Sequence, residues 1–269
     1  MKRFFYFDKF PFFFFILLIF INFSLFSHPI KKDGLVFETY SKENFTIHHR
    51  GKKKAIESLT SELLIFQNQV LPTYFSNLPP KIVIYLYRNT TEYNSKKNTQ
   101  HETYAHFEPK SKELFSFVDS GTGPIFHELV HLYLSLQSIS NNRILWFEEG
   151  FSSFFESPKK DNFGNYIFDE PNWRMESIKG KWTDLSTFIK TIDLRENHSK
   201  AQARILFLWL FKKNILPQFI KTYHENLDFD NSGAEALQEV TGTQIDEINI
   251  EMKKFKEELE NSSSSKSVK

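Results

Sequence analysis

Residues 123–133 are Gly123-Pro124-Ile125-Phe126-His127-Glu128-Leu129-Val130-His131-Leu132-Tyr133, an apolar segment with two histidines four positions apart. Residues four apart lie on one face of an α-helix, so His127 and His131 can direct two imidazole nitrogens at one ion. Glu128 lies one residue round from His127, where its carboxylate can reach a water on that ion. This HExxH pattern is typical of zinc hydrolases and predicts a Zn²⁺ site with Glu128 as general base. The alternative is a pair of core histidines on a buried helix.

A second apolar segment follows in the order Trp146-Phe147-Glu148-Glu149-Gly150-Phe151. The polar residues 138–142 predict the turn that joins it to the first segment. Zinc held by three protein groups keeps a fourth position for water and lowers the pKa of that water to about 7. The second segment therefore lies where a third protein ligand is expected.

The two segments together resemble the gluzincin clan of zinc peptidases, the superfamily of thermolysin and aminopeptidase N. In that clan the second helix begins with a W-x-x-E-G-x-[AS] pattern, and its glutamate is the third zinc ligand. The resemblance implies Glu149 as that ligand, with Glu148 as a solvated neighbour. It also implies a zinc metallopeptidase in which Glu128 activates a zinc-bound water to hydrolyse peptide bonds. The alternatives are a catalytically inactive zinc-binding module that acts outside the cytoplasm and a membrane-anchored scaffold without metal.

The same clan suggests where an oxyanion donor should lie. Aminopeptidase-like members use a tyrosine just before a helix of the C-terminal lobe, and thermolysin-like members use a histidine. The corresponding residues, 196–201, contain no tyrosine. His198 is the candidate catalytic donor, followed by Lys200 and Tyr223.

Thermolysin-like members also place an acid four residues after the third ligand, where it orients a zinc histidine. Ser153 occupies that position here, and a hydroxyl is a weak partner for an imidazole. Glu156 is expected to be a surface or helix-end charge. The isolated histidines show no ligand spacing and are expected to be structural or solvated, namely His48, His49, His101, His106 and His224.

The composition limits the kinds of function. The chain has 269 residues, which suits one domain or two closely packed lobes. Its 34 basic and 33 acidic residues nearly cancel, so nucleic-acid binding has no electrostatic support. It contains no cysteine, which excludes disulfides and thiolate ligands and leaves histidine and carboxylate to hold a metal. We expect a monomer that acts on a peptide or protein substrate.

The N-terminus predicts export from the cytoplasm. Lys2 and Arg3 precede an apolar run at 10–26, the shape of a signal peptide over residues 1–27. Cleavage after Ser27 leaves an extracytoplasmic protein, either periplasmic or secreted. Without cleavage, residues 10–26 provide an N-terminal membrane anchor, although a short one against the ~20 residues of a spanning helix.

The order of elements predicts an α+β, zincin-like fold that resembles small peptidase-MA-like gluzincins. A small N-terminal lobe, 28–137, should hold a mixed sheet and the HExxH helix. A mainly helical lobe, 138–260, should follow, with the zinc cleft between the lobes and a disordered tail at 261–269. The strands are expected at 35–40, 44–49, 81–87, 103–107 and 114–118, and the main helices at 55–71, 144–156, 199–213, 216–226, 233–240 and 244–260.

Two features are expected to control substrate access. Strand 114–118 lies just before the zinc helix, and in gluzincins that strand pairs with an extended substrate. An ordinary sheet edge is the alternative. The segment 157–183 should form a long surface loop by the cleft, held down by Trp173 and Trp182. No exopeptidase motif of the G-x-M-E-N type stands near 105–117, which favours an endopeptidase or a narrow processing activity.

Overall fold

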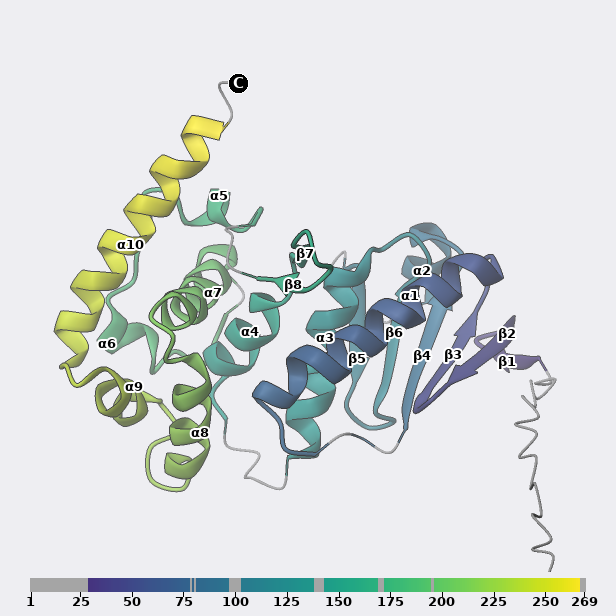
Figure 1. Cartoon of the computed structure of the whole chain (residues 1–269), viewed down its shortest axis with the longest axis horizontal. Helices are drawn as coiled ribbons and strands as arrows, with labels where there is room; N and C mark the ends of the chain where they lie inside the picture. The colour runs from purple at the N-terminus through teal and green to yellow at the C-terminus, as the bar shows by residue number, and fades with distance from the viewer. Residues whose placement is uncertain are drawn as a thin grey trace, which may run out of the picture.

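The computed structural model describes residues 29–266 except 78, 80, 97–102, 138–142, 169–171 and 195. The expected signal peptide or anchor, residues 1–27, lies outside the described residues, as does His101. The molecule is elongated, with a sheet and its helices at one end and a mainly helical part at the other (Figure 1). Within the described ranges, none of the helices is both long and apolar enough to cross a membrane.

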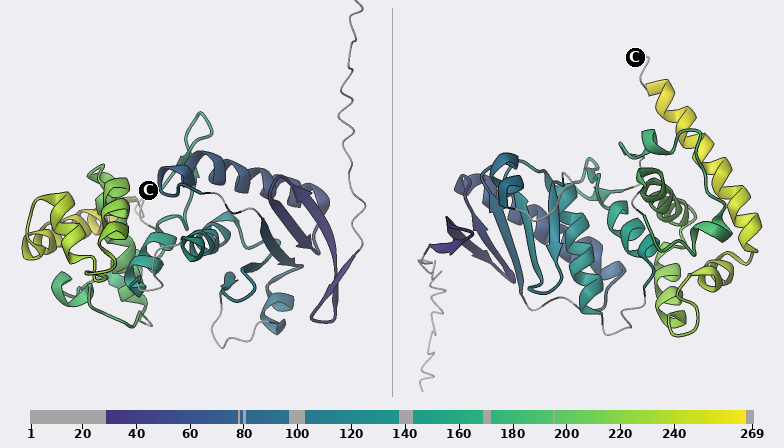
Figure 2. Two further views of the ribbon diagram at one scale, coloured as in Figure 1. Left: turned by 90° about the horizontal axis from the view of Figure 1, so that it is seen from below. Right: turned by 180° about the vertical axis from the view of Figure 1, so that it is seen from behind.

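The N-terminal part contains one mixed, curled sheet of six strands in the order β1-β2-β3-β4-β6-β5. The strands are β1 (Ile30–Lys32), β2 (Leu35–Lys42), β3 (Phe45–His49), β4 (Ile82–Tyr87), β5 (Ala105–Glu108) and β6 (Glu113–Phe117). β4 pairs in parallel with β3 and with β6, whereas the other pairs are antiparallel. The predicted hairpins and the central position of β4 are confirmed. Figure 2 shows the β1–β2 arm curling away from the rest of the sheet.

The prediction for the substrate-facing strand is wrong in one respect. Residues 114–118 correspond to β6, which is hydrogen-bonded to β4 on one side and to β5 on the other. β5 is therefore the edge strand of the sheet at this end. The sequence pattern predicts a hairpin, but it does not specify which arm inserts beside β4, because both arms have similar apolar alternation.

Helices cover one face of the sheet. These are α1 (Lys53–Ile65), which continues as the π-helical turn η1 (Phe66–Val70) and the 3₁₀ turn η2 (Leu71–Thr73), and α3 (Thr122–Leu136). The shorter helix α2 (Thr90–Lys96) follows β4. Ile82, Ile84 and Leu86 point to the core beneath α1 and α3, whereas Tyr85 and Tyr87 join a smaller aromatic cluster on the opposite face. This two-residue alternation follows from the pleat of the strand.

The C-terminal part is mainly helical, as predicted. Its elements are α4 (Leu145–Phe154), the hairpin β7 (Lys159–Lys160) and β8 (Tyr166–Ile167), α5 (Met175–Ile178), α6 (Leu185–Phe188), α7 (Asn197–Lys212), α8 (Leu216–Asn226), α9 (Ala234–Thr241) and α10 (Ile245–Lys266). α4 lies between α3 and α7 (Figure 1). Gly150 allows α4 to approach α7 closely, since a Cβ there would lie 2.7 Å from the Phe207 ring.

Two details differ from the sequence-based expectations. The segment 157–183 contains the β7–β8 hairpin and α5, and Trp173 does not hold it down, because this residue is 66% exposed. Trp182 does hold the segment down, since its Nε1 donates to Asn249 Oδ1 of α10 at 2.8 Å. The prediction of a disordered tail from 261 is wrong for residues 261–266, because α10 continues through Lys266.

Candidate metal centre

Helix α3 brings the two predicted histidines together. Its apolar residues, including Phe126, Leu129 and Val130, are buried in the core, which turns the other side of the helix toward α4. The Nε2 atoms of His127 and His131 are 3.1 Å apart. Zn–N bonds are about 2.0–2.1 Å long, so two imidazole nitrogens on one tetrahedral ion stand roughly this far apart.

Helix α4 supplies the third group of the cluster. Glu149 Oε2 lies 4.0 Å from His127 Nε2, and its Oε1 lies 3.8 Å from His131 Nε2. One ligand atom from each residue falls within 4.8 Å of the others, which is a compact set for a single cation. Two imidazoles and a carboxylate are a donor set that zinc accepts. Glu148 points elsewhere, since its Oε1 pairs with Arg143 Nε at 3.0 Å.

Glu128 is a carboxyl of the site whose pKa is raised. Burial raises its pKa to about 7, and the nearby charge of Glu149 acts in the same direction, while His127 and the Phe107 backbone N–H oppose the rise. Phe107 belongs to β5, so the edge strand passes directly beside Glu128. A carboxyl with a pKa near neutrality can both accept and return a proton at physiological pH.

The two histidines differ in their electrostatics. Burial lowers the pKa of His131 to about 3, helped by the neighbouring His127, so His131 is neutral at physiological pH. Burial acts to lower the pKa of His127 as well, but Glu156, Glu128 and Glu149 together raise it above its usual value. A neutral imidazole is the form that binds a metal.

The sequence-based prediction for Glu156 is wrong. Its side chain is only 10% exposed, and its Oε1 lies 3.0 Å from Nδ1 of His127. Arg174 donates to the same carboxylate through Nε, at 2.7 Å, and through Nη2, at 2.5 Å. Although burial opposes its ionisation, the bonds from Arg174 and His127 hold the pKa of Glu156 well below its usual range. Glu156 therefore lies where it can orient the ring of His127.

No spacing rule points to Glu156, because it lies just beyond the end of α4 and its partner Arg174 comes from the segment before α5. A close approach of α3 to this turn is required, and Gly123 permits it, since a Cβ at that position would lie 1.8 Å from the Glu156 carbonyl oxygen. Ser153 has no orienting role, because its hydroxyl donates to the Gly150 carbonyl of its own helix at 3.1 Å.

Replacing Glu156 by alanine is expected to weaken zinc binding by roughly 10–100-fold, the usual cost of losing a partner that orients a metal-bound histidine. Glu156→Gln should lose less, because an amide oxygen can still accept from Nδ1. Zinc affinity measured by competition with a chromophoric chelator checks this. Glu148→Ala is the matched control, and equal affinities in Glu156→Ala and wild type would contradict the orienting role.

The three candidate oxyanion donors lie in different surroundings. His198 Nδ1 is 3.4 Å from the exposed Glu196 carboxylate, and the structure does not place it in the metal cluster of the described residues. Lys200 Nζ lies 3.7 Å from Glu149 Oε2, directly beside that cluster. Tyr223 is structural, since its buried hydroxyl accepts from the Ile144 N–H and donates to the Asn231 carbonyl.

The isolated histidines on the sheet have structural partners, as expected. His48 Nδ1 contacts Thr39 Oγ1 at 2.9 Å, and His106 Nδ1 contacts the Tyr93 hydroxyl at 2.8 Å. His49 Nδ1 lies 3.2 Å from the Gly51 carbonyl oxygen. None of them belongs to the metal cluster found among the described residues.

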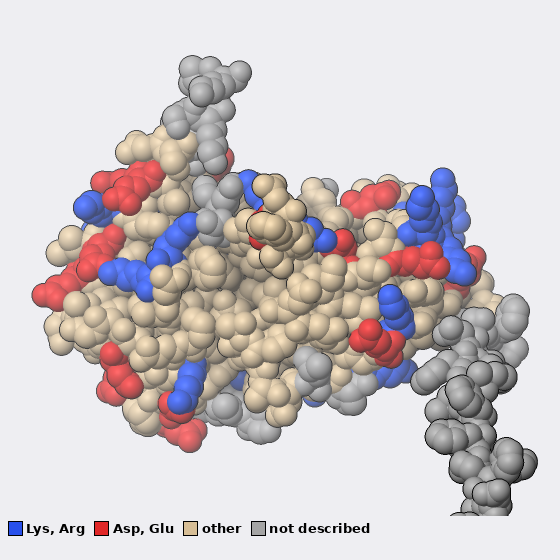
Figure 3. Space-filling model, in the orientation of Figure 1, with Lys and Arg blue, Asp and Glu red and all other residues tan. Residues whose placement is uncertain are grey.

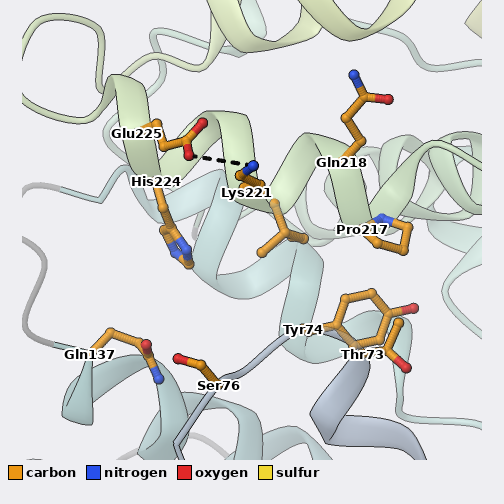
Figure 4. Close-up of a pocket in the computed structure, with 10 residues that line it drawn as sticks. Thr73, Tyr74, Ser76, Gln137, Pro217, Gln218, Lys221, His224 and Glu225 are labelled. Atoms are coloured by element: carbon orange, nitrogen blue, oxygen red, sulfur yellow. Dashed lines mark ion pairs between the residues drawn. The ribbon is translucent and has the colours of Figure 1, made fainter.

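A pocket of about 660 Å³ has a lining separate from the candidate metal ligands. Figure 4 shows it between α8 and the chain around η2, with His224 and Lys221 on one side and Tyr74 and Ser76 on the other. Its described lining does not include the three cluster residues. Burial lowers the pKa of His224 to about 4, so this histidine is neutral and packs against the ring of Phe147.

No family model matches the chain, and a search of curated proteins gives no significant match.

Proposed function

We propose that this protein is a zinc-dependent metallopeptidase with a zincin-like fold of the gluzincin type. In this proposal His127, His131 and Glu149 hold the ion, and Glu128 is the general base. The observation that carries it is the convergence of three ligand atoms from α3 and α4, with the two Nε2 atoms 3.1 Å apart. The orientation of His127 by the Glu156–Arg174 pair supports it, because metal-bound histidines characteristically have such a partner.

Three protein ligands leave room for a water and a substrate oxygen at zinc. When bound, zinc supplies a Lewis acid that polarises a carbonyl and lowers the pKa of a water. The absence of cysteine agrees with a site made of imidazole and carboxylate.

Glu128 performs the proton transfers. Its buried carboxylate accepts a proton from the attacking water and returns it to the nitrogen of the leaving amine. The Phe107 N–H donates to this carboxylate and holds it in place. A positioned acid–base group typically accelerates such a reaction by about 10²–10⁴-fold.

The position of β5 at the edge of the sheet favours a peptide as the substrate. β5 pairs only with β6 in the described sheet, so its outer edge can add an extended strand. Such a peptide would run past Glu128, because Phe107 of β5 donates to that carboxylate. Binding through backbone hydrogen bonds needs no free peptide terminus, which agrees with endopeptidase activity.

Acidic and basic side chains are intermixed on the face shown in Figure 3, over a largely uncharged surface. This distribution agrees with the overall charge balance of 34 basic and 33 acidic residues. Backbone pairing and the metal site therefore account for substrate binding better than a long-range field of one sign.

Removal and return of the metal test the proposal. Zinc-loaded protein is expected to cleave members of a quenched fluorescent peptide library, to lose this activity after treatment with 1,10-phenanthroline, and to regain it with about one zinc per chain. Cleavage that persists in metal-free protein would contradict a metallopeptidase. A zinc-loaded protein that cleaves no peptide would instead favour the binding module.

A further inference from the structure

Lys200 lies beside the candidate metal ligands His127, His131 and Glu149. Lys200 is in the first turn of α7, and its Nζ lies 3.7 Å from Glu149 Oε2. Its side chain is 35% exposed, so the ammonium stands between the cluster and solvent. Its positive charge also acts on His131. A partly exposed cation therefore lies beside the residues that would hold zinc.

The face of α7 that carries Lys200 is fixed by its packing on α4. Residues three and four later, Ala203 and Arg204, touch that helix: the Ala203 carbonyl approaches Gly150, and Arg204 Nη1 donates to the Ser153 and Phe154 carbonyls. Residues three and four apart share a face. His198 is two positions before Lys200, about 200° round the helix, and its Nδ1 lies 3.4 Å from Glu196.

We propose that Lys200 is the anion-binding residue of this site and that it binds a negatively charged oxygen of the peptide substrate. The inference rests on the proposed function. The oxygen is either the one formed at the attacked carbonyl or a terminal carboxylate next to the cleaved bond. Glu149 serves as the counter-ion of Lys200 while no metal is bound. Once Glu149 ligates a cation, its charge is shared with that ion, which frees the ammonium for the substrate oxygen.

The chemistry of lysine suits this role. An ammonium is a compact charge on a flexible four-carbon stem, so it can follow an oxygen over a short distance. A positive group near a developing oxyanion in a partly dry site stabilises the transition state more than the neutral ground state. A peptide without a charged oxygen near the cluster should therefore gain little from Lys200.

Binding to zinc-loaded protein tests the inference without relying on turnover. Calorimetry compares wild type, Lys200→Met and Lys200→Arg with two probe sets. The first set compares the affinity for a phosphinic peptide, which carries a charged tetrahedral group, with the affinity for the same peptide containing an ordinary amide. The amide peptide is measured in the Glu128→Gln background, so that it is not cleaved. The second is a product peptide with a free terminal carboxylate against its terminal amide.

Lys200→Met is expected to weaken phosphinic peptide binding by about 10²-fold, with partial recovery in Lys200→Arg and little change for the uncharged peptide. This result identifies the carbonyl oxygen as the anion. If Lys200→Met instead loses only the tighter binding of the free carboxylate over the terminal amide, the anion is the terminal carboxylate. Lys179→Met is the control, because it removes the same charge from a surface pair with Glu176.

The inference is overturned if Lys200→Met binds both probe sets as tightly as wild type. Tighter zinc binding by Lys200→Met with unchanged probe affinities also overturns it, because Lys200 is then only a counter-ion of Glu149. Zinc content is measured first. A wild type that takes up no zinc defeats the proposed function, whereas a zinc-loaded wild type that binds the phosphinic peptide independently of Lys200 defeats this inference alone.

Discussion

Glu128→Gln is expected to abolish peptide hydrolysis while leaving zinc bound. Glutamine has the shape of glutamate but cannot accept the proton of the attacking water, so the rate should fall by at least about 10²-fold. The fold should tolerate the change, because burial already raises the pKa of Glu128 to about 7 and favours a neutral side chain. Peptide cleavage and zinc content are measured on the same preparation.

The matched control is Glu148→Gln, the same substitution on α4. Glu148 pairs with Arg143 and does not face the cluster, so the variant should cleave peptides at the wild-type rate. Retained hydrolysis in Glu128→Gln would remove Glu128 from the role of general base. An inactive wild type with zinc bound would place the protein among zinc-stabilised binding modules.

Purified full-length protein is expected to contain about one zinc per chain, and Glu149→Ala is expected to lose most of it. Alanine removes a ligand whose oxygens lie 4.0 Å from His127 Nε2 and 3.8 Å from His131 Nε2. Two histidines alone leave an incomplete site with weaker affinity. Elemental mass spectrometry after dialysis measures the difference.

Glu148→Ala distinguishes the third ligand from its neighbour, since both residues are glutamates in the first turns of α4. It should keep its zinc. Equal zinc in Glu149→Ala and wild type would exclude Glu149 as a ligand. No zinc in wild type, even after reconstitution, would remove the metallopeptidase mechanism altogether.

The sequence by itself determined the features that depend on one element. His127 and His131 converge because four residues make about one turn of α3, whatever packs around it. Glu128 follows from the same helix. The central place of β4 follows from its continuous apolar run, since a strand covered on both faces needs apolar residues on both. Glu149 could be predicted only from the resemblance to gluzincins. It lies on α4, and no helix or strand periodicity relates positions on α4 to positions on α3.

Only the tertiary structure decided the features that depend on how elements pack together. Glu156 and Arg174 meet behind His127 because Gly123 lets the start of α3 touch the turn after α4. The insertion of β6 beside β4 makes β5 the edge strand at this end of the sheet. Lys200 comes within 3.7 Å of Glu149 because α7 packs on α4 through one particular face. The geometry along one helix is set by a fixed rotation per residue, whereas contacts between elements depend on the packing of many side chains.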